Sequence, residues 1–317
     1  MSKYNDNKSD NFMEPTVSQY GSHMVMTNVH KPMKTKYVNI DTIFADEYNL
    51  NNTADYNITL PEKITNVQSI SISNIDLPMS FYNISSDLGN NVFNLNYKNN
   101  NIINDTTYTK YIIEVPNNQY NTITELVTAI NTVIQSSATE RFGTTNIFVA
   151  NNNKVSLTNQ LTNLITISFD VNAIGTDRYN FKSKLGWLLG FRKLNYTLPP
   201  TPSPTPIYAE CNYNINTVRY MYLVMDEFSR GNQNTFISPL PLSLINKNII
   251  AKLSLNSTFA FNSIIPLNRF TGLMTDQRSY SGKIDLQKLN IKLINEYGKP
   301  INLNGNHFSF CMEIVYE

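Results

Sequence analysis

The last stretch of the chain, residues 282–317, constrains the fold most, because its apolar residues alternate over two long runs. In the second run, residues 308–316, large apolar side chains fall on every second position: Phe308, Phe310, Met312, Ile314 and Tyr316. Ser309, Cys311 and Glu313 occupy positions between them. A side-chain period of two over this length is typical of a β-strand with one buried face. The sequence therefore predicts that this terminal strand is part of the hydrophobic core.

The first run, residues 284–293, carries the same pattern with one interruption. Ile284 and Leu286 point one way, and the stripe continues one residue out of phase after Gln287-Lys288, through Leu289, Ile291 and Leu293. One extra residue in an alternating strand indicates a β-bulge. We interpret the rest of the chain as elements that pair with these two strands.

The segment before residue 107 adds further strands. Alternating apolar residues predict strands over residues 38–44, 56–60 and 93–97. Residues 63–77 are rich in β-branched side chains at irregular spacing, which favours a bent or bulged strand. The loop over residues 80–86 contains large apolar side chains, so we expect it to be held in place by packing. Residues 1–35 are polar and unpatterned, which predicts an extended or disordered N-terminal arm.

Residues 107–206 have a different character and predict a compact α+β unit. One amphipathic helix has its apolar residues on a single stripe, at Ile123, Leu126, Val127, Ile130, Val133 and Ile134. Thr122 and Glu125 have the spacing of a capping box. Strands are predicted over residues 111–115, 147–149, 155–157 and 165–171, and a short helix over residues 183–190 with Ser183 as its cap and Gly190 as its end. The proline-rich residues 199–206 are expected to form an exposed connection out of this unit.

Strands resume after residue 206. They are predicted over residues 218–225, 249–255 and 259–261, whereas residues 262–281 are interpreted as a long irregular loop. Without residues 107–206, about eight strands remain, four on each side, which is the number in a jelly roll. The predicted fold is a mainly β, antiparallel jelly-roll sandwich in two halves, residues 36–106 and 207–317. Residues 107–206 are the inserted α+β module, and residues 1–35 are the arm. The alternative is two consecutive domains divided at the proline tract.

Composition excludes several classes of function. The net charge is +1 and no long basic run occurs, so the features of a nucleic-acid-binding protein are absent. No run of eighteen apolar residues indicates a membrane span, and the first residues do not form a signal peptide. Cys211 and Cys311 are isolated, which argues against a disulfide framework or a zinc motif. The 48 asparagines, beside only 15% charged residues, suit a β-protein rich in turns.

Residues with catalytic or metal-binding chemistry do not form a recognisable motif. The three histidines, His23, His30 and His307, are far apart, and we expect His307 to be a hydrogen-bonded structural residue. Zinc-ligand spacings, calcium loops, glycine-rich phosphate loops and the Gly-x-Ser-x-Gly motif are absent from the sequence. We therefore predict no enzymatic activity and no catalytic, cofactor-binding or metal-binding residues.

Three short groups of acidic and basic residues are the remaining candidates: Asp226 and Glu227 with Arg230, Asp276 with Arg278, and Glu140 with Arg141. Adjacent carboxylates at a strand end point apart and are usually solvated. The second group is expected to be a turn or a surface ion pair, which contributes little to stability. An arginine at a helix end suits the helix dipole. We interpret all three groups as surface features rather than active sites.

Seven short stretches are spread over most of the chain from residue 36 onward. They are residues 36–41 (KYVNID), 70–78 (ISISNIDLP), 81–85 (FYNIS), 185–191 (LGWLLGF), 221–226 (MYLVMD), 286–291 (LQKLNI) and 308–310 (FSF). Taken in this order, they resemble capsid proteins of large icosahedral DNA viruses of eukaryotes, the giant-virus type. The resemblance implies a virion structural protein of the minor capsid or vertex (penton) type, built on a jelly roll. It implies no catalytic residues.

The expected function is that of a non-enzymatic capsid component at the vertex of the shell. Its copies would associate side by side through the sandwich, and the N-terminal arm would reach a neighbouring subunit. The expected partners are other copies, possibly in a homopentamer, the major capsid protein and other minor capsid proteins, in a virion assembled in the host cytoplasm. Two alternatives remain: a minor capsid protein that cements the major capsid layer, and a carbohydrate-binding or host-attachment module that uses exposed tyrosine and asparagine side chains.

Overall fold

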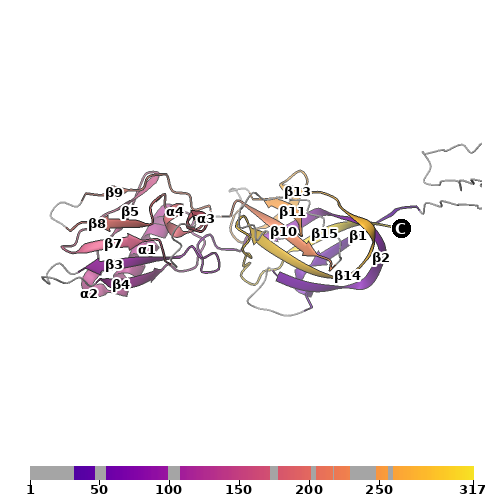
Figure 1. The fold of residues 1–317 in the computed structure, drawn as a ribbon, viewed down its shortest axis with the longest axis horizontal. Helices are drawn as coiled ribbons and strands as arrows, with labels where there is room; N and C mark the ends of the chain where they lie inside the picture. Colours follow the sequence, from indigo (N-terminus) through magenta and orange to yellow (C-terminus); the bar gives the residue numbers. More distant parts are fainter. Residues whose placement is uncertain are drawn as a thin grey trace, which may run out of the picture.

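The protein consists of two lobes that lie side by side along its long axis (Figure 1). The computed structural model describes residues 32–46, 55–98, 108–171, 178–200, 205–216, 218–228, 248–255 and 260–317. One lobe is a β-sandwich built from both ends of this range, and the other is an α+β module from its middle. Residues 1–31 of the predicted N-terminal arm, which spans residues 1–35, lie outside the described residues.

The first layer of the sandwich contains four antiparallel strands. In spatial order they are β1 (Lys34–Asp41), β15 (Ser309–Tyr316), the second half of β2 (Asp55–Pro78) and β12 (Ile264–Asn268). The short 3-10 helix η1 (Thr42–Phe44) follows β1. β1 and β12 are therefore the two edges of this layer.

The second layer is also antiparallel and shares β2 with the first. Its order is the first half of β2, then β14 (Arg278–Asn295), β10 (Tyr220–Asp226) and β11 (Ile249–Ser254), with the short β13 (Leu273–Thr275) beside β11. β2 pairs with β14 between Asp55 and Ile70 and with β15 between Val67 and Asp76, and Asn66, whose φ of 59° is left-handed, lies just before this overlap. Asparagine adopts this conformation more readily than most residues. The bent strand predicted over residues 63–77 is confirmed.

Two antiparallel layers, of four strands and of four strands plus the short β13, with the first and last strands adjacent, form a jelly roll. The apolar faces of both layers meet in one core, which includes Ile72, Ile75, Leu223, Leu293 and Phe310. The predicted fold class, a mainly β jelly-roll sandwich with an inserted α+β module, is therefore confirmed.

The two terminal runs lie where the sequence pattern predicts. Phe308, Phe310, Met312 and Ile314 are buried, whereas the residues between them are partly exposed. The register between β14 and β2 shifts between Leu286 and Lys288, at the predicted interruption, but the extra residues lie on β2, between Thr59 and Ile64, so the bulge predicted in β14 itself is wrong. β15 lies between β1 and β2, so it is an interior strand of its layer.

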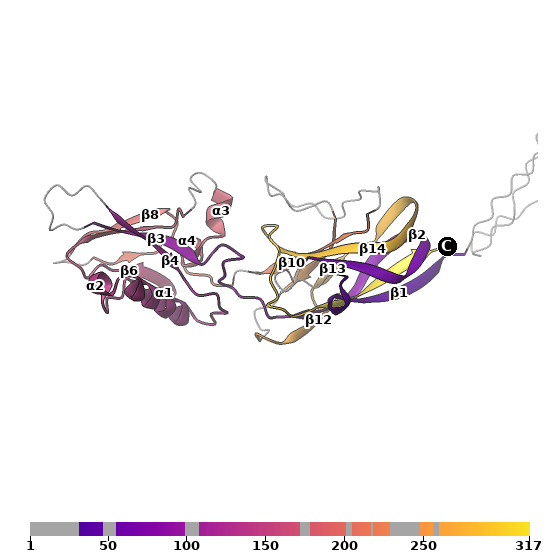
Figure 2. The same ribbon diagram turned by 90° about the horizontal axis from the view of Figure 1, so that it is seen from below.

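The α+β module contains two small antiparallel sheets. The first has the order β4 (Thr109–Glu114), β3 (Val92–Lys98), β7 (Leu164–Ser168) and β8 (Asn195–Leu198). The second has the order β5 (Phe148–Asn151), β6 (Lys154–Leu157) and β9 (Ile207–Tyr208). Helix α1 (Ile123–Ser137) packs against β4 and β5, below the strands in Figure 2, and α2 (Thr139–Phe142), α3 (Arg178–Lys182) and α4 (Leu185–Leu188) are short.

The helix signals are confirmed in part. Thr122 accepts from the backbone of Glu125, whose side chain accepts from the backbone of Thr122, so the capping box is present. The predicted cap of α4 is wrong, because Ser183 donates its hydroxyl to Asn180 O and the N-cap position is Lys184. Gly190 follows α4 with a φ of +96°, a conformation that glycine adopts at little cost and that fits its predicted place at the helix end.

Two predicted boundaries are wrong, and for the same reason. β3 was expected in the sandwich, but it pairs with β4 and β7, and Phe93 and Leu95 lie in the core of the module. The proline tract connects β8 to β9 within the module, and Ile215 still packs in that core. Strand patterns show which residues are buried but not which core buries them. The inserted segment therefore begins before β3 and ends after Ile215.

The prediction of an irregular loop over residues 262–281 is also wrong. This segment contains β12, β13 and the first residues of β14. Pro266, which argues against a strand in the sequence, lies in an edge strand, where its missing N–H need not pair.

Cleavage within residues 199–206 is expected to leave the two fragments associated. β9 would stay paired with β6 across the cut, and β10 to β15 would stay packed on β1 and β2. A specific protease site placed in this tract, followed by size-exclusion chromatography and a denaturing gel, measures this. Two folded halves that elute separately would contradict the insertion and restore the model of two consecutive domains.

Candidate functional site at the junction of the two lobes

The first predicted acid–base pair, Glu140 and Arg141, lies exposed in α2 on the surface of the module. Nη1 of Arg141 donates to the hydroxyl of Tyr111 at 2.6 Å, and its guanidinium lies 5.1 Å from the ring centroid of Tyr97. Arg141 therefore contributes a cation–π contact at the surface.

Arg278 and Glu227, by contrast, form a buried ion pair. Arg278 is 1% exposed, and its Nη1 lies 2.7 Å from Oε2 of Glu227, which is buried too. The guanidinium also donates to the backbone oxygens of Met225 and Asn248, both at 2.9 Å. Tyr280 donates its hydroxyl to Oε1 of Glu227 at 2.9 Å. We call Arg278, Glu227 and Tyr280 the Arg278 cluster.

The prediction of solvated or surface charges is therefore wrong for Glu227 and Arg278. Asp276 itself is exposed and accepts from the backbone of Gln277, Asp226 accepts from the backbone of Phe228, and Arg230 lies outside the described residues. The partner of Arg278 is 51 residues away in the chain, so no local spacing indicates it. The one available signal is that Arg278 and Tyr280 are two residues apart at the start of an alternating strand, and thus share a face.

The Arg278 cluster holds parts of the sandwich together. Burial and the nearby charge of Glu227 raise the pKa of the Tyr280 hydroxyl, which therefore stays protonated and donates. Both carboxylate oxygens of Glu227 are engaged, and Nε of Arg278 has no hydrogen-bond partner among the described residues. Because Arg278 holds the end of β10 and the start of β11 together, the cluster joins the two chain segments on either side of residues 229–247.

The histidine and cysteine side chains of the described residues do not gather into one group. His307 places Nδ1 3.5 Å from the hydroxyls of Thr42 and Tyr56, and His23 and His30 lie outside the described residues. Cys211 and Cys311 are free thiols in different lobes. Within the described ranges, no group of three or more His, Cys, Asp or Glu side chains could hold a metal ion.

The junction loop, residues 79–91, connects the lobes by packing into both of them. Phe81 and Leu88 belong to the sandwich core, whereas Ile84 belongs to the module core. The buried Asn83 donates to the backbone oxygens of Tyr120 at 2.9 Å and Ile215 at 3.2 Å, and accepts from the backbone of Tyr120. The packing expected for the loop at residues 80–86 is present, and it restrains the orientation of the lobes.

Two lysines from different lobes converge on this loop. Lys184 of the module and Lys299 of the sandwich each donate Nζ to a backbone oxygen at 2.8 Å, those of Gly89 and Leu88. A Cβ on Gly89 would lie 3.2–3.3 Å from both ammonium groups, and its φ is +66°, so this position favours glycine. Burial lowers the pKa of both lysines, and the charge of Lys299 lowers that of Lys184 further.

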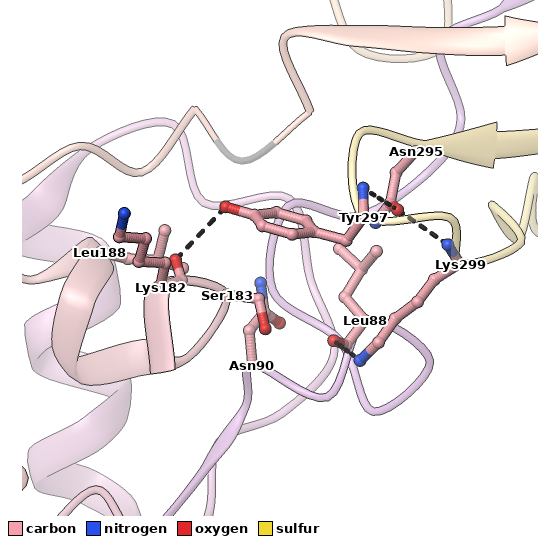
Figure 3. A pocket seen from close by; sticks show the side chains of 8 residues that line it. All are labelled: Leu88, Asn90, Lys182, Ser183, Leu188, Asn295, Tyr297 and Lys299. Carbon is pink, nitrogen blue, oxygen red and sulfur yellow. Dashed lines mark hydrogen bonds between the residues drawn. The ribbon is translucent and has the colours of Figure 1, made fainter. Parts of the chain in front are cut away.

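A small pocket lies beside these lysines, between the lobes (Figure 3). Tyr297 extends from the sandwich across it, and its hydroxyl donates to Lys182 O at 3.4 Å. The cavity is about 20 Å³, which is room for about one water molecule. The junction can thus hold the two lobes in a fixed orientation, but it is too small for a substrate.

Large apolar side chains are exposed at both edges of the first sandwich layer. Tyr37, Ile43 and Phe44 lie on β1 and η1, while Ile264 and the 97% exposed Phe270 lie on β12 and the turn that follows it. We call these the β1 edge and the β12 edge. Exposed apolar groups that gather at one edge are the kind from which protein contact surfaces are built.

Comparison with known proteins gives little further information. No protein family model and no curated protein sequence matches the chain. The crystal structure of the mavirus penton protein is similar over 90% of this chain and 99% of its own, with a TM-score of 0.38 and 8% sequence identity. A likeness this distant carries no conclusion. In the described part of the chain, no helix is long and apolar enough to cross a bilayer.

Proposed function

We propose that the chain is a non-enzymatic structural protein of an icosahedral viral capsid, of the vertex type, and that its copies associate side by side through the sandwich. The observation that carries this proposal is the exposed apolar side chains at the β1 edge and the β12 edge. The stretches that resemble capsid proteins form β1, β2, β10, β14, β15, the junction loop and the α4 region. They thus build the jelly roll and fix the module to it.

The position of the two edges favours a ring. β1 and β12 lie at opposite sides of the same layer, so the β1 edge of one copy can meet the β12 edge of the next. A contact between two different surfaces is heterologous, and it closes into a ring when the rotation per subunit allows it. The restrained junction would place every module in the same orientation around such a ring.

Purified protein is expected to form a homopentamer of about 181 kDa, five times the 36.2 kDa chain. Native mass spectrometry gives the mass, and negative-stain electron microscopy gives the symmetry. Phe270→Asp at the β12 edge is expected to abolish the pentamer, because it places a charge in the apolar contact. The matched control is Ile112→Asp, because Ile112 is also an exposed apolar residue but lies on β4 of the module.

Other outcomes favour the alternatives. A monomer or trimer would favour a minor capsid protein below the major capsid layer. The carbohydrate-binding alternative is motivated by Tyr37, Tyr108 and Tyr208, which are exposed on separate elements. Specific binding on a glycan array by a chain that does not self-associate would replace the vertex proposal with that alternative.

A further inference from the structure

An open groove lies in the module between helix α1 and strand β5. It measures about 340 Å³, and Thr124, Thr128 and Gln135 of α1 face Phe148 and Ala150 of β5 across it. This is within the size range of pockets that bind ligands, about 300–1,000 Å³. β5 is an edge strand of its sheet, because among the strands that the structure describes it pairs with β6 alone, in the order β5-β6-β9.

Asn131 already acts as a strand partner for one residue of this edge. Its Nδ2 donates to Phe148 O at 2.8 Å, and its Oδ1 accepts from Phe148 N at 3.0 Å. The backbone groups of Phe148 therefore point away from β6 and towards α1. Backbone groups in an antiparallel ladder alternate in direction, so those of Ala150, two residues on, point to the same side. Ala150 also lines the groove, and its N–H and C=O are placed to pair with an added strand.

The lining of the groove indicates what kind of strand it accepts. All ten residues that line it are uncharged, and five of the six on α1 are threonine, asparagine or glutamine. The exposed face of a helix usually carries Lys, Glu or Arg. A charged peptide would lose water here without gaining an ion pair. The groove thus suits an uncharged, extended segment that pairs through its backbone, as in strand addition to a sheet edge.

The sequence contains one long segment of this chemistry before β1. Residues 15–30 contain no Asp, Glu, Lys or Arg, and they include Val17, Met24, Val25, Met26 and Val29. β1 begins beside the C-terminus, since Lys34 pairs with Tyr316, and this end of the sandwich faces away from the module (Figure 1). Pro15, the far end of this segment, lies 17 residues before Pro32 and reaches at most about 60 Å from it when extended, so an adjacent copy must present its groove within that distance.

We propose that the groove between α1 and β5 is a docking site for a short extended stretch within residues 15–30 of a neighbouring copy. The docked segment pairs with Ala150 and places its small and apolar side chains over Thr124, Val127 and Thr128. The inference rests on the proposed self-assembly for its occupant, but the binding step itself requires no ring.

The test measures binding of a labelled peptide, residues 14–31, to the full chain by fluorescence anisotropy, at a concentration below self-association. Saturable binding is expected. Ala150→Pro removes the outward N–H without disturbing the ladder to β6, and it should weaken binding about fivefold or more. Thr128→Lys places a charge in the groove from an exposed position, and it should weaken binding by at least as much.

Ser136→Lys is the matched control, since Ser136 is exposed on α1 outside the groove, and binding should be unchanged. Equal binding of a scrambled peptide would overturn the proposal, and so would unchanged binding to Thr128→Lys. The two proposals can fail separately. A chain that forms the pentamer at high concentration but does not bind the peptide when dissociated removes the docking site alone, and a chain that stays monomeric but binds the peptide through the groove removes the pentamer alone.

Discussion

Ending the chain after Gly305 is expected to give a protein whose sandwich does not fold. The lost residues include four buried core side chains, Phe308, Phe310, Met312 and Ile314. Each large-to-small change in a core costs about 2–5 kcal/mol, and a whole domain is stable by only about 5–15 kcal/mol. Because β15 lies between β1 and β2, its removal also leaves both neighbours without their ladder hydrogen bonds.

The measurement is thermal unfolding followed by circular dichroism, for the full chain and the truncated chain. The module has a separate core, so we expect the signal of α1 to persist while the cooperative β transition disappears. Removing only Glu317, which costs its ion pair with Lys283 and its hydrogen bonds with Gln68 and Asn66 but no core side chain, is the control and should lower the stability far less. A soluble truncated protein with the full β transition and native assembly would refute the architecture.

Point variants on β15 separate packing from truncation. Met312→Ala faces the core and is expected to destabilise the sandwich by about 2–5 kcal/mol. Cys311→Ala faces outward on the same strand and is expected to cost less than about 1 kcal/mol. Equal effects at the two positions would mean that the inward face of β15 is not what holds the layers together.

Local periodicity accounts for the parts of the fold that could be predicted. The alternation of β15, the change of phase in the buried residues of β14 and the stripe of α1 each depend on side chains within a few residues of one another. A strand must turn every second side chain to one face, and a helix must turn every third or fourth. Such patterns fix an element and its buried face. They carry no information about which other strand will pair with it.

The predictions that fail are those that depend on pairing between strands far apart in the sequence. β3 has the same alternation as a sandwich strand, and only its pairing with β4 and β7 places it in the module. β12 and β13 lie where the sequence predicts a loop, and Pro266, Asn268 and Gly272 in this segment are residue types that usually interrupt strands. Lys184 and Lys299 come from different lobes, and no sequence spacing brings them to Gly89. The junction is thus a product of the tertiary fold.

Arg278→Met is expected to destabilise the sandwich by about 3–5 kcal/mol, because it leaves the buried carboxylate of Glu227 without its cation. Methionine has a similar length, so packing is largely kept. Adding Glu227→Met should restore part of the loss, because no unpaired charge then remains. Urea unfolding of the wild type, both single variants and the double variant gives the coupling free energy.

The surface ion pair between Lys36 and Glu62 provides the contrast. Its N–O distance of 2.9 Å is close to the 2.7 Å between Arg278 and Glu227, but it is exposed. Lys36→Met should therefore change stability by less than about 1 kcal/mol. If Arg278→Met were as mild as Lys36→Met, the Arg278 cluster would not hold β10 and β11 together. If the double variant were no more stable than Arg278→Met, the cost would come from the lost bonds to Met225 and Asn248 rather than from the unpaired charge.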